Sequence, residues 1–222
     1  NGSIHFHEDF RAKPTVAVGS YGLIVKTKAK KKNPKPGDLI FSVGGSTGRD
    51  GIHGATFSSG EMTSKTMSVS GSAVQIGNPI EEKRVIDLVL DLSSKNLIRT
   101  LTDCGAGGYS SAVGEIGKNT GVIVNLENVP LKYSNLAPWE MFLSESQERM
   151  VLAIKSENLK KVQSLCKLYN VNGAVIGKFT NNRRLKVKYK KQTVCDLTMQ
   201  FLHNGLPQRI MIGNSSKVNI VE

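Results

Sequence analysis

Residues 102–108 (TDCGAGG) place one carboxylate beside three glycines, a combination that suits a phosphorylated ligand. Asp103 follows the run Leu97–Leu101, which predicts a strand, and the glycines precede a predicted helix over Tyr109–Ile116. Glycine lets the backbone approach a ligand closely, and the N–H groups at a helix N-terminus attract anions. An Asp beside such a turn can hold Mg²⁺, which prefers oxygen ligands and substrate phosphates. Taken alone, the segment fits a plain strand-to-helix turn equally well.

The glycine-rich loop over residues 44–57 (GGSTGRDGIHGATF) is long enough to suggest a functional role. Its Arg49 could bind a phosphate in a bidentate manner, and the loop also contains Asp50 and His53. No Gly-Lys-Ser/Thr sequence ends the loop, so it is not a Walker motif. A pair of Arg49 with an Asp that braces the loop explains these residues as well as direct ligand contact does.

Two further polar segments adjoin predicted elements. Gln75 lies just before Asn78 and Pro79, an N-cap residue and a first-turn proline that predict a helix start. Its amide could bind a carbonyl and an N–H group of a ligand together, or simply face solvent. Residues 144–149 (SESQER) lead into a predicted strand over 150–154. Because such a polar run is costly to bury without partners, it is either a solvated turn or a ligand-binding segment.

Strands and helices alternate along the chain, which predicts an α/β (α+β) fold with helices packed on a mixed sheet. The predicted strands cover residues 14–27 (one or two strands), 39–43, 97–101, 122–126, 150–154, 174–179, 185–189 and 193–197. The predicted helices begin at Pro79, Tyr109, Trp139 and residue 157. Residues 28–37 are rich in Lys, Pro and Gly and indicate a linker, and the tail from about residue 199 is less regular.

The chain has 222 residues and a formal net charge of +12, which could attract nucleic acid or another polyanion. The basic residues of 26–35 lie in a Pro-containing stretch, and those of 183–191 alternate with Leu185 and Val187. These patterns are typical of a solvated linker and of a half-buried strand, so nucleic-acid binding is disfavoured. No apolar run approaches the ~20 residues that span a bilayer, so no membrane association is expected.

The three cysteines, Cys104, Cys166 and Cys195, are far apart and form no CxxC pair. This spacing argues against a disulfide framework or a zinc site, and it favours a reducing compartment. Cys104 could be proposed as a nucleophile because it adjoins Asp103. No histidine is marked to activate its thiol, so a packing role is the better prediction.

Four segments, in order and in spacing, resemble the phosphoribosylformylglycinamidine synthases of de novo purine synthesis: GGSTGRDGIHGATF (44–57), VQIGNPIEEK (74–83), TDCGAGG (102–108) and LSESQERM (143–150). The resemblance covers nearly the whole chain and implies the fold of the aminoimidazole ribonucleotide synthetase superfamily, with a PurM C-terminal-like domain. It implies that residues 1–27 are the last strands of a ferredoxin-like N-terminal-type domain and that a linker spans 28–37. The C-terminal-type domain would then cover 38–198, and 199–222 would be a linker or the start of the next segment.

Synthases of this family are ligases that convert formylglycinamide ribonucleotide (FGAR) to the amidine with ATP, Mg²⁺ and glutamine-derived ammonia. The resemblance implies that Asp103 is a Mg²⁺ ligand, that Gln75 contacts the substrate, and that Glu145, Ser146 and Gln147 form a substrate-binding triplet. It also implies a cytoplasmic enzyme whose partners are the remaining domains of the synthetase and a glutaminase domain or subunit. A homodimer is a further possible assembly.

The chain also departs from the family. The catalytic His motifs, further Mg²⁺ and ATP ligands and the glutaminase Cys–His domain are absent, and position 78 is Asn where the family often has Asp. We therefore expect an internal fragment that has no catalytic residue of its own and cannot turn over alone. One alternative is a selenophosphate synthetase or thiamine-phosphate kinase type of relative, against which the segment ESQER argues. Another alternative is a non-catalytic basic module that binds nucleotide or RNA.

Overall fold

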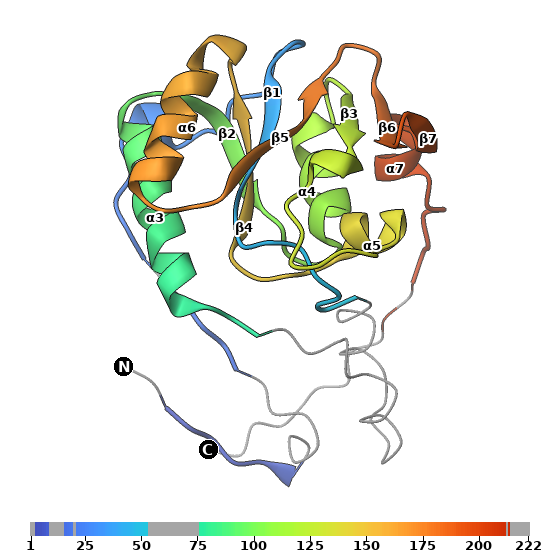
Figure 1. The fold of residues 1–222 in the computed structure, drawn as a ribbon. Helices are drawn as coiled ribbons and strands as arrows, with labels where there is room; N and C mark the ends of the chain where they lie inside the picture. The colour runs from blue at the N-terminus through green and yellow to red at the C-terminus, as the bar shows by residue number, and fades with distance from the viewer. Residues whose placement is uncertain (1–2, 9–15, 20, 53–75, 212, 214–222) are drawn as a thin grey trace.

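The computed structural model describes residues 3–8, 16–19, 21–52, 76–211 and 213 (Figure 1). Within these residues, seven strands form one sheet in the order β2-β4-β1-β5-β3-β6-β7. The strands are β1 (Leu39–Gly44), β2 (Ile98–Asp103), β3 (Val122–Asn125), β4 (Arg149–Ile154), β5 (Gly173–Phe179), β6 (Arg184–Tyr189) and β7 (Gln192–Thr198). Neighbouring strands run antiparallel except β3 and β6, which are parallel, so the predicted mixed sheet is confirmed.

Helices cover both faces of this sheet (Figure 1). Two of them, α3 (Pro79–Ser94) and α6 (Leu159–Leu168), pack on one face, and α4 (Gly108–Gly117), α5 (Pro138–Leu143) and α7 (Met199–Asn204) pack on the other. Successive side chains of a strand point to opposite faces, so Leu152 of β4 packs with α3 and α6 while Val151 packs with α4. Short 3-10 helices occupy Lys26–Lys28, Leu126–Asn128 and Ser156–Asn158. The predicted fold class is therefore confirmed.

The start of α3 follows the sequence signals closely. Asn78 accepts hydrogen bonds at 3.2 Å from the backbone N–H groups of Ile80 and Glu81, and Pro79 occupies the first helical position. Three side chains at helical spacing then bury the inner face of α3, namely Val85, Leu88 and Leu92. The helix therefore begins at a defined residue and with a defined face inward, which matters because its first turn lies at the candidate site.

The basic residues of β6 behave as the alternating pattern predicts. Leu185 and Val187 are buried, and Lys186 lies between them on the wetter face. Asp196 of β7 accepts a hydrogen bond from Arg184 Nε at 2.7 Å and lies 3.2 Å from Lys186 Nζ. Part of the positive charge on this strand pair is thus balanced by a carboxylate.

Two predictions about the ends of the chain are wrong. Residues 16–19 and 21–25 form no strand and Lys26–Lys28 is a 3-10 helix, because a strand forms only beside another strand and these side chains are largely exposed. The tail predicted to be irregular begins with α7, whose first residue, Met199, is buried in the core. The assignment of 1–27 to a separate domain stays a prediction. Within the described residues, no helix is both long and apolar enough to cross a membrane.

Candidate functional site

One edge of the sheet gathers the predicted site segments. β1 and β2 end at this edge and β4 begins there, because β4 runs antiparallel to both of these neighbours. Asp103, the last residue of β2, pairs with Met150, the second residue of β4. Residues 144–148, which we call the α5–β4 segment, lead into β4 and carry the triplet 145–147. The fold therefore brings Asp103 to the same edge as the predicted substrate-binding triplet.

Two helices begin at this edge and bind the α5–β4 segment through their first backbone groups. The N–H of Asn78, the N-cap residue of α3, donates to Glu148 Oε1 at 2.8 Å. The N–H of Gly107, the N-cap residue of α4, donates to Glu145 Oε1 at 3.0 Å. A carboxylate of the protein itself thus occupies part of the helix N-terminus that was predicted to attract an anion. Gln75 lies outside the described residues.

Arg149, the first residue of β4, binds the backbone of the α5–β4 segment through its side chain and is only 3% exposed. Its Nε donates to the carbonyl oxygen of Ser146 at 2.8 Å, and its other two nitrogens donate to the carbonyl oxygen of Ser144 and to Thr47 Oγ1. The guanidinium carbon lies 4.7 Å from the centroid of the Tyr109 ring, a cation–π distance. One buried cation therefore links the segment to the loop after β1 and to α4.

The hydroxyl of Ser146 is fully engaged inside the protein. It donates to Asp50 Oδ2, accepts from the N–H of Gly48 at 2.9 Å and lies 3.0 Å from Ser144 Oγ. With an exposed fraction of 1%, this side chain serves to fix the α5–β4 segment on the loop 44–52. Glu145 is also buried, with an exposed fraction of 6%, whereas Gln147 is half-buried, so Gln147 is the member of the triplet most accessible to a ligand.

Two glycines allow the α5–β4 segment to lie directly on neighbouring backbone. A Cβ atom at Gly44 would lie 1.9 Å from the carbonyl oxygen of Glu148, and one at Gly108 would lie 1.9 Å from that of Ser144. Both residues also have positive φ, at +102° and +54°, a conformation that glycine adopts without steric strain. Gly108 of the predicted turn thus allows a close approach to the backbone of the same chain, in addition to any approach to a ligand.

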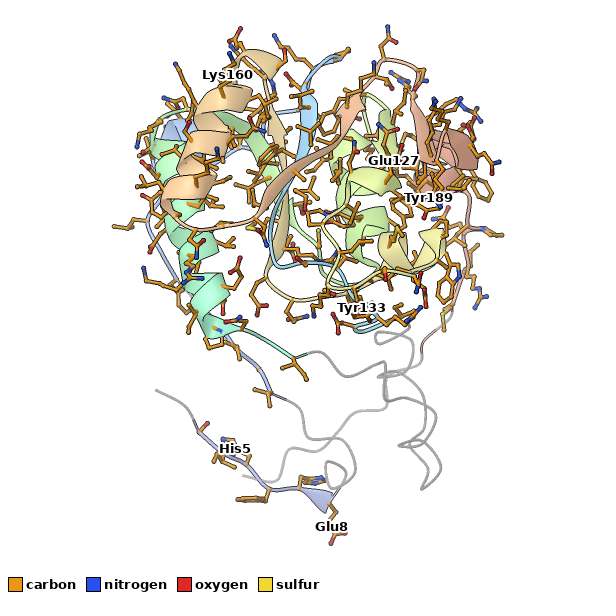
Figure 2. All side chains as sticks on the ribbon, in the orientation of Figure 1. His5, Glu8, Glu127, Tyr133, Lys160 and Tyr189 are labelled. Atoms are coloured by element: carbon orange, nitrogen blue, oxygen red, sulfur yellow. The ribbon has the colours of Figure 1, made fainter. Side chains whose placement is uncertain are left out.

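Arg49 braces the loop 44–52, although not through the neighbouring Asp that the sequence suggested. Its Nε donates to Glu140 Oε1 at 2.7 Å, and its terminal nitrogen donates to the carbonyl oxygen of Asn135 at 2.8 Å. The hydrogen bond from Arg49 to Glu140, together with the positive charge of Arg49, holds the pKa of Glu140 below its usual range. Tyr133, labelled at the lower side of the folded body and above His5 and Glu8 in Figure 2, accepts the backbone N–H of Arg49 at 2.7 Å. His53 lies outside the described residues.

Asp50 instead forms an ion pair with Lys132, at 2.5 Å between Oδ2 and Nζ, and accepts the hydroxyl of Ser146. Partial burial disfavours its charged form. The hydrogen bonds from Lys132 and Ser146, with the charges of Lys132 and Arg149, outweigh burial and lower the pKa of Asp50 below its ordinary value. The charged carboxylate therefore helps to hold the α5–β4 segment in place.

We expect Asp50→Asn to weaken the dependence of stability on acid pH. Because the pKa of Asp50 is lower in the folded chain, its contribution is fully present above the unfolded value of about 4 and is lost as the pH falls through the folded value. The wild-type chain should therefore lose more stability on acidification than the variant. Urea unfolding between neutral and acid pH measures this difference. Asp87→Asn, which breaks an exposed pair with Lys83 on α3, is the control, and equal pH profiles for both variants would contradict the expectation.

The carboxylate of Asp103 is exposed at the end of β2 and makes no hydrogen bond or ion pair with any described side chain. A cluster of three or more His, Cys, Asp or Glu residues suited to a metal ion is not found in the described part of the chain. Mg²⁺ is commonly held by one or two carboxylates together with water and substrate phosphates. An accessible Asp103 fits that limited role, and it does not fit a metal cage made by this chain alone.

The thiol of Cys104 points into the core and is 5% exposed. Burial raises its pKa to about 12, so almost none of it is thiolate at neutral pH. The predicted packing role is therefore the one that the environment supports.

Several residues that organise this edge could not be recognised from local sequence patterns. Lys132, Glu140 and Tyr109 are far along the chain from their partners, and Tyr109 also hydrogen-bonds Ser42 at 2.6 Å between hydroxyl oxygens. Arg149 itself could be recognised from the sequence. A charged side chain directly before a buried strand is costly to bury unless it has hydrogen-bond partners in the fold.

Comparison with known proteins places this geometry in context. Residues 35–190 match the family described as AIR synthase related protein, C-terminal domain. The phosphoribosylformylglycinamidine synthase subunit PurL of Thermoplasma acidophilum is 39% identical over 207 residues, which cover 92% of this chain and 27% of that protein. The chain thus spans about a quarter of the length of the curated relatives it matches.

Two solved structures show the same arrangement of elements. PurL of T. maritima complexed with FGAR is 32% identical and superposes with a TM-score of 0.76 over 86% of this chain and 32% of that one. The same protein complexed with ATP is 30% identical, with a TM-score of 0.70 over 84% of this chain and 29% of that one.

Proposed function

Since the chain belongs to the AIR synthase related proteins, whose C-terminal domain its residues 35–190 match, we propose that it is the part of a phosphoribosylformylglycinamidine synthase that holds the substrate. The observation that carries this proposal is the sheet edge where the loop 44–52, the turn 103–108 and the α5–β4 segment meet. These segments resemble the synthases in sequence, and a protein of that name is 39% identical to the chain. Because the chain covers about 27% of them, the activity is proposed for a longer protein.

That longer protein would be a ligase of purine synthesis in the cytoplasm. It would use ATP and Mg²⁺ and receive ammonia from a glutaminase partner. The amide oxygen of FGAR would be phosphorylated, and ammonia would then displace the phosphate to give the amidine. Phosphorylation converts a poor leaving oxygen into a good one, so positioning and charge stabilisation are what the protein must supply. No described residue of this chain is proposed to be catalytic.

The residues of the sheet edge would bind and orient FGAR. Glu145 carries a carboxylate that accepts well from hydroxyl groups, and Gln147 Nε2 donates to the carbonyl oxygen of Glu145 at 3.1 Å. Ser146 would act by fixing the α5–β4 segment, and Gln75 remains a proposed contact. The exposed carboxylate of Asp103 would hold Mg²⁺, which when bound would offset phosphate charge.

Titration calorimetry of the chain with FGAR tests the proposal. We expect Glu145→Gln to weaken FGAR binding about tenfold, because a hydrogen bond to a charged group is worth about 1.5–3 kcal/mol. Gln keeps an oxygen that can accept from the N–H of Gly107, so the fold should survive. Glu127→Gln is the matched control, since Glu127 is exposed on the 3-10 helix after β3, well away from Tyr133 in Figure 2.

The same titration with and without Mg²⁺ tests the metal role of Asp103. Any gain in FGAR affinity from Mg²⁺ in the wild-type chain should disappear in Asp103→Asn and persist in Glu127→Gln. Absence of FGAR binding by the wild-type chain, or equal affinities of Glu145→Gln and Glu127→Gln, would contradict the proposed substrate site. An unchanged Mg²⁺ response in Asp103→Asn would contradict the metal role alone.

A further inference from the structure

A polar cavity of about 420 Å³ lies at the end of α4, beside the first residues of β6 and against α7. Its size falls within the range of small-molecule sites, about 300–1,000 Å³. Three cations line it, Lys118, Arg183 and Arg184, together with amide side chains such as Asn182, and its described lining contains no carboxylate. Such a lining suits a small anion better than an apolar ligand.

The backbone around this cavity is held in place from several sides. The N–H of Arg183 donates to the carbonyl oxygen of Thr120 at 2.7 Å, and its own carbonyl oxygen accepts from the N–H of Met199 at 2.8 Å. Asn182 Oδ1 accepts from Thr180 Oγ1 at 2.8 Å and from the N–H of Arg184 at 3.1 Å. The turn that presents Arg183 is therefore fixed to the residues that follow α4 and to the first residue of α7 before any ligand binds.

Two of the three cations lack a balancing charge. Arg184 is paired with Asp196, at 2.7 Å between Nε and Oδ1. The side chains of Lys118 and Arg183 make no hydrogen bond or ion pair with the described residues, although both line the cavity. Arg183 also has φ of +52°, in the left-handed region that non-glycine residues seldom adopt. A positively charged concavity with two uncommitted cations on a fixed frame is a suitable receptor for a phosphate group.

We propose that this cavity binds the phosphate group of a small molecule, with Lys118 and Arg183 as its cationic contacts. Arg183 can bind two phosphate oxygens at once, and Lys118 supplies a mobile point charge. The site is separate from the sheet edge described above, since its residues come from the end of α4 and the edge uses the beginning of α4. The source of the phosphate can be the free ion or a mononucleotide, and the experiment distinguishes them.

Titration calorimetry of the full chain with inorganic phosphate and with AMP tests this inference. We expect at least one probe to bind the wild-type chain, and Arg183→Asn and Lys118→Gln each to weaken that binding about tenfold. Asn tolerates positive φ, so Arg183→Asn should keep the turn. Tighter binding of AMP than of phosphate would identify a nucleotide, and equal binding would identify the free ion.

Lys191→Asn is the matched control, because Lys191 is exposed, has φ of +69° and does not line the cavity. Its affinity for either probe should equal that of the wild-type chain. Failure of both probes to bind the wild-type chain would overturn the inference, as would equal losses in Arg183→Asn and Lys191→Asn. Salt-sensitive binding of an RNA oligonucleotide with no binding of AMP would also overturn it. None of these results depends on whether the sheet edge binds FGAR.

Discussion

Arg149→Met is expected to lower the free energy of unfolding by about 3 kcal/mol and to abolish tight FGAR binding. The substitution leaves the carbonyl oxygens of Ser144 and Ser146 and the hydroxyl of Thr47 without their donor. Each buried polar group left unpaired is worth about 1–3 kcal/mol. Replacing a buried cation by an apolar residue can stabilise a protein, but only where its former partners are replaced as well. Here the partners remain, so the loss should dominate.

Urea unfolding gives the stability of this variant, and titration calorimetry gives its affinity for FGAR. Arg149→Lys should fall between the wild-type chain and Arg149→Met, because a lysine keeps the charge but cannot direct three donors as the planar guanidinium does. Arg84→Met is the control, since Arg84 lies on the exposed side of α3 and its nearest carboxylate is 3.9 Å away. A change below about 0.5 kcal/mol in Arg149→Met would show that the α5–β4 segment does not depend on this cation.

The contacts of Arg149 also explain what the sequence could and could not predict. The strand β6 and the helix α3 were predictable because local signals decide them: alternating apolar residues in β6, and an Asn-Pro start with helical spacing in α3. The extent of the polar run before β4 was also visible. Its partners were not, because Thr47 lies 102 residues away and only the sheet order brings it to Arg149.

The loop after β1 shows the same limit. The local pattern suggests a pair of Arg49 with a neighbouring Asp, whereas the fold pairs Arg49 with Glu140, 91 residues away, and Asp50 with Lys132. The helix α7 was missed for a different reason: it has only six residues, too few to show a helical period, and its signal is the single cap Thr198. Resemblance to the synthases, rather than local pattern, was what grouped Asp103 with Glu145.

The expected effect of Gly108→Ala shows how closely α4 and the α5–β4 segment depend on each other. A Cβ atom at this position would lie 1.9 Å from the carbonyl oxygen and 2.9 Å from the carbonyl carbon of Ser144. Both are backbone atoms, which cannot rotate away as the end of a side chain can. Because Arg149 and Gly107 hold the same segment, relief of the clash requires α4 to move from Ser144 or the segment to detach. We expect a loss of stability of at least about 3 kcal/mol.

Gly107→Ala separates this clash from the cost of the backbone conformation. Gly107 also has positive φ, +77°, but the nearest atom to its Cβ would be Ser110 Oγ at 3.3 Å. The expected loss of stability in Gly107→Ala is therefore only the cost of holding an alanine in a left-handed backbone conformation, about 1–2 kcal/mol. Urea unfolding of both variants measures the difference, and FGAR titration of Gly107→Ala should still detect binding. If Gly108→Ala were no less stable than Gly107→Ala, the segment would not rest on α4, and Glu145 would have no fixed position from which to bind a substrate.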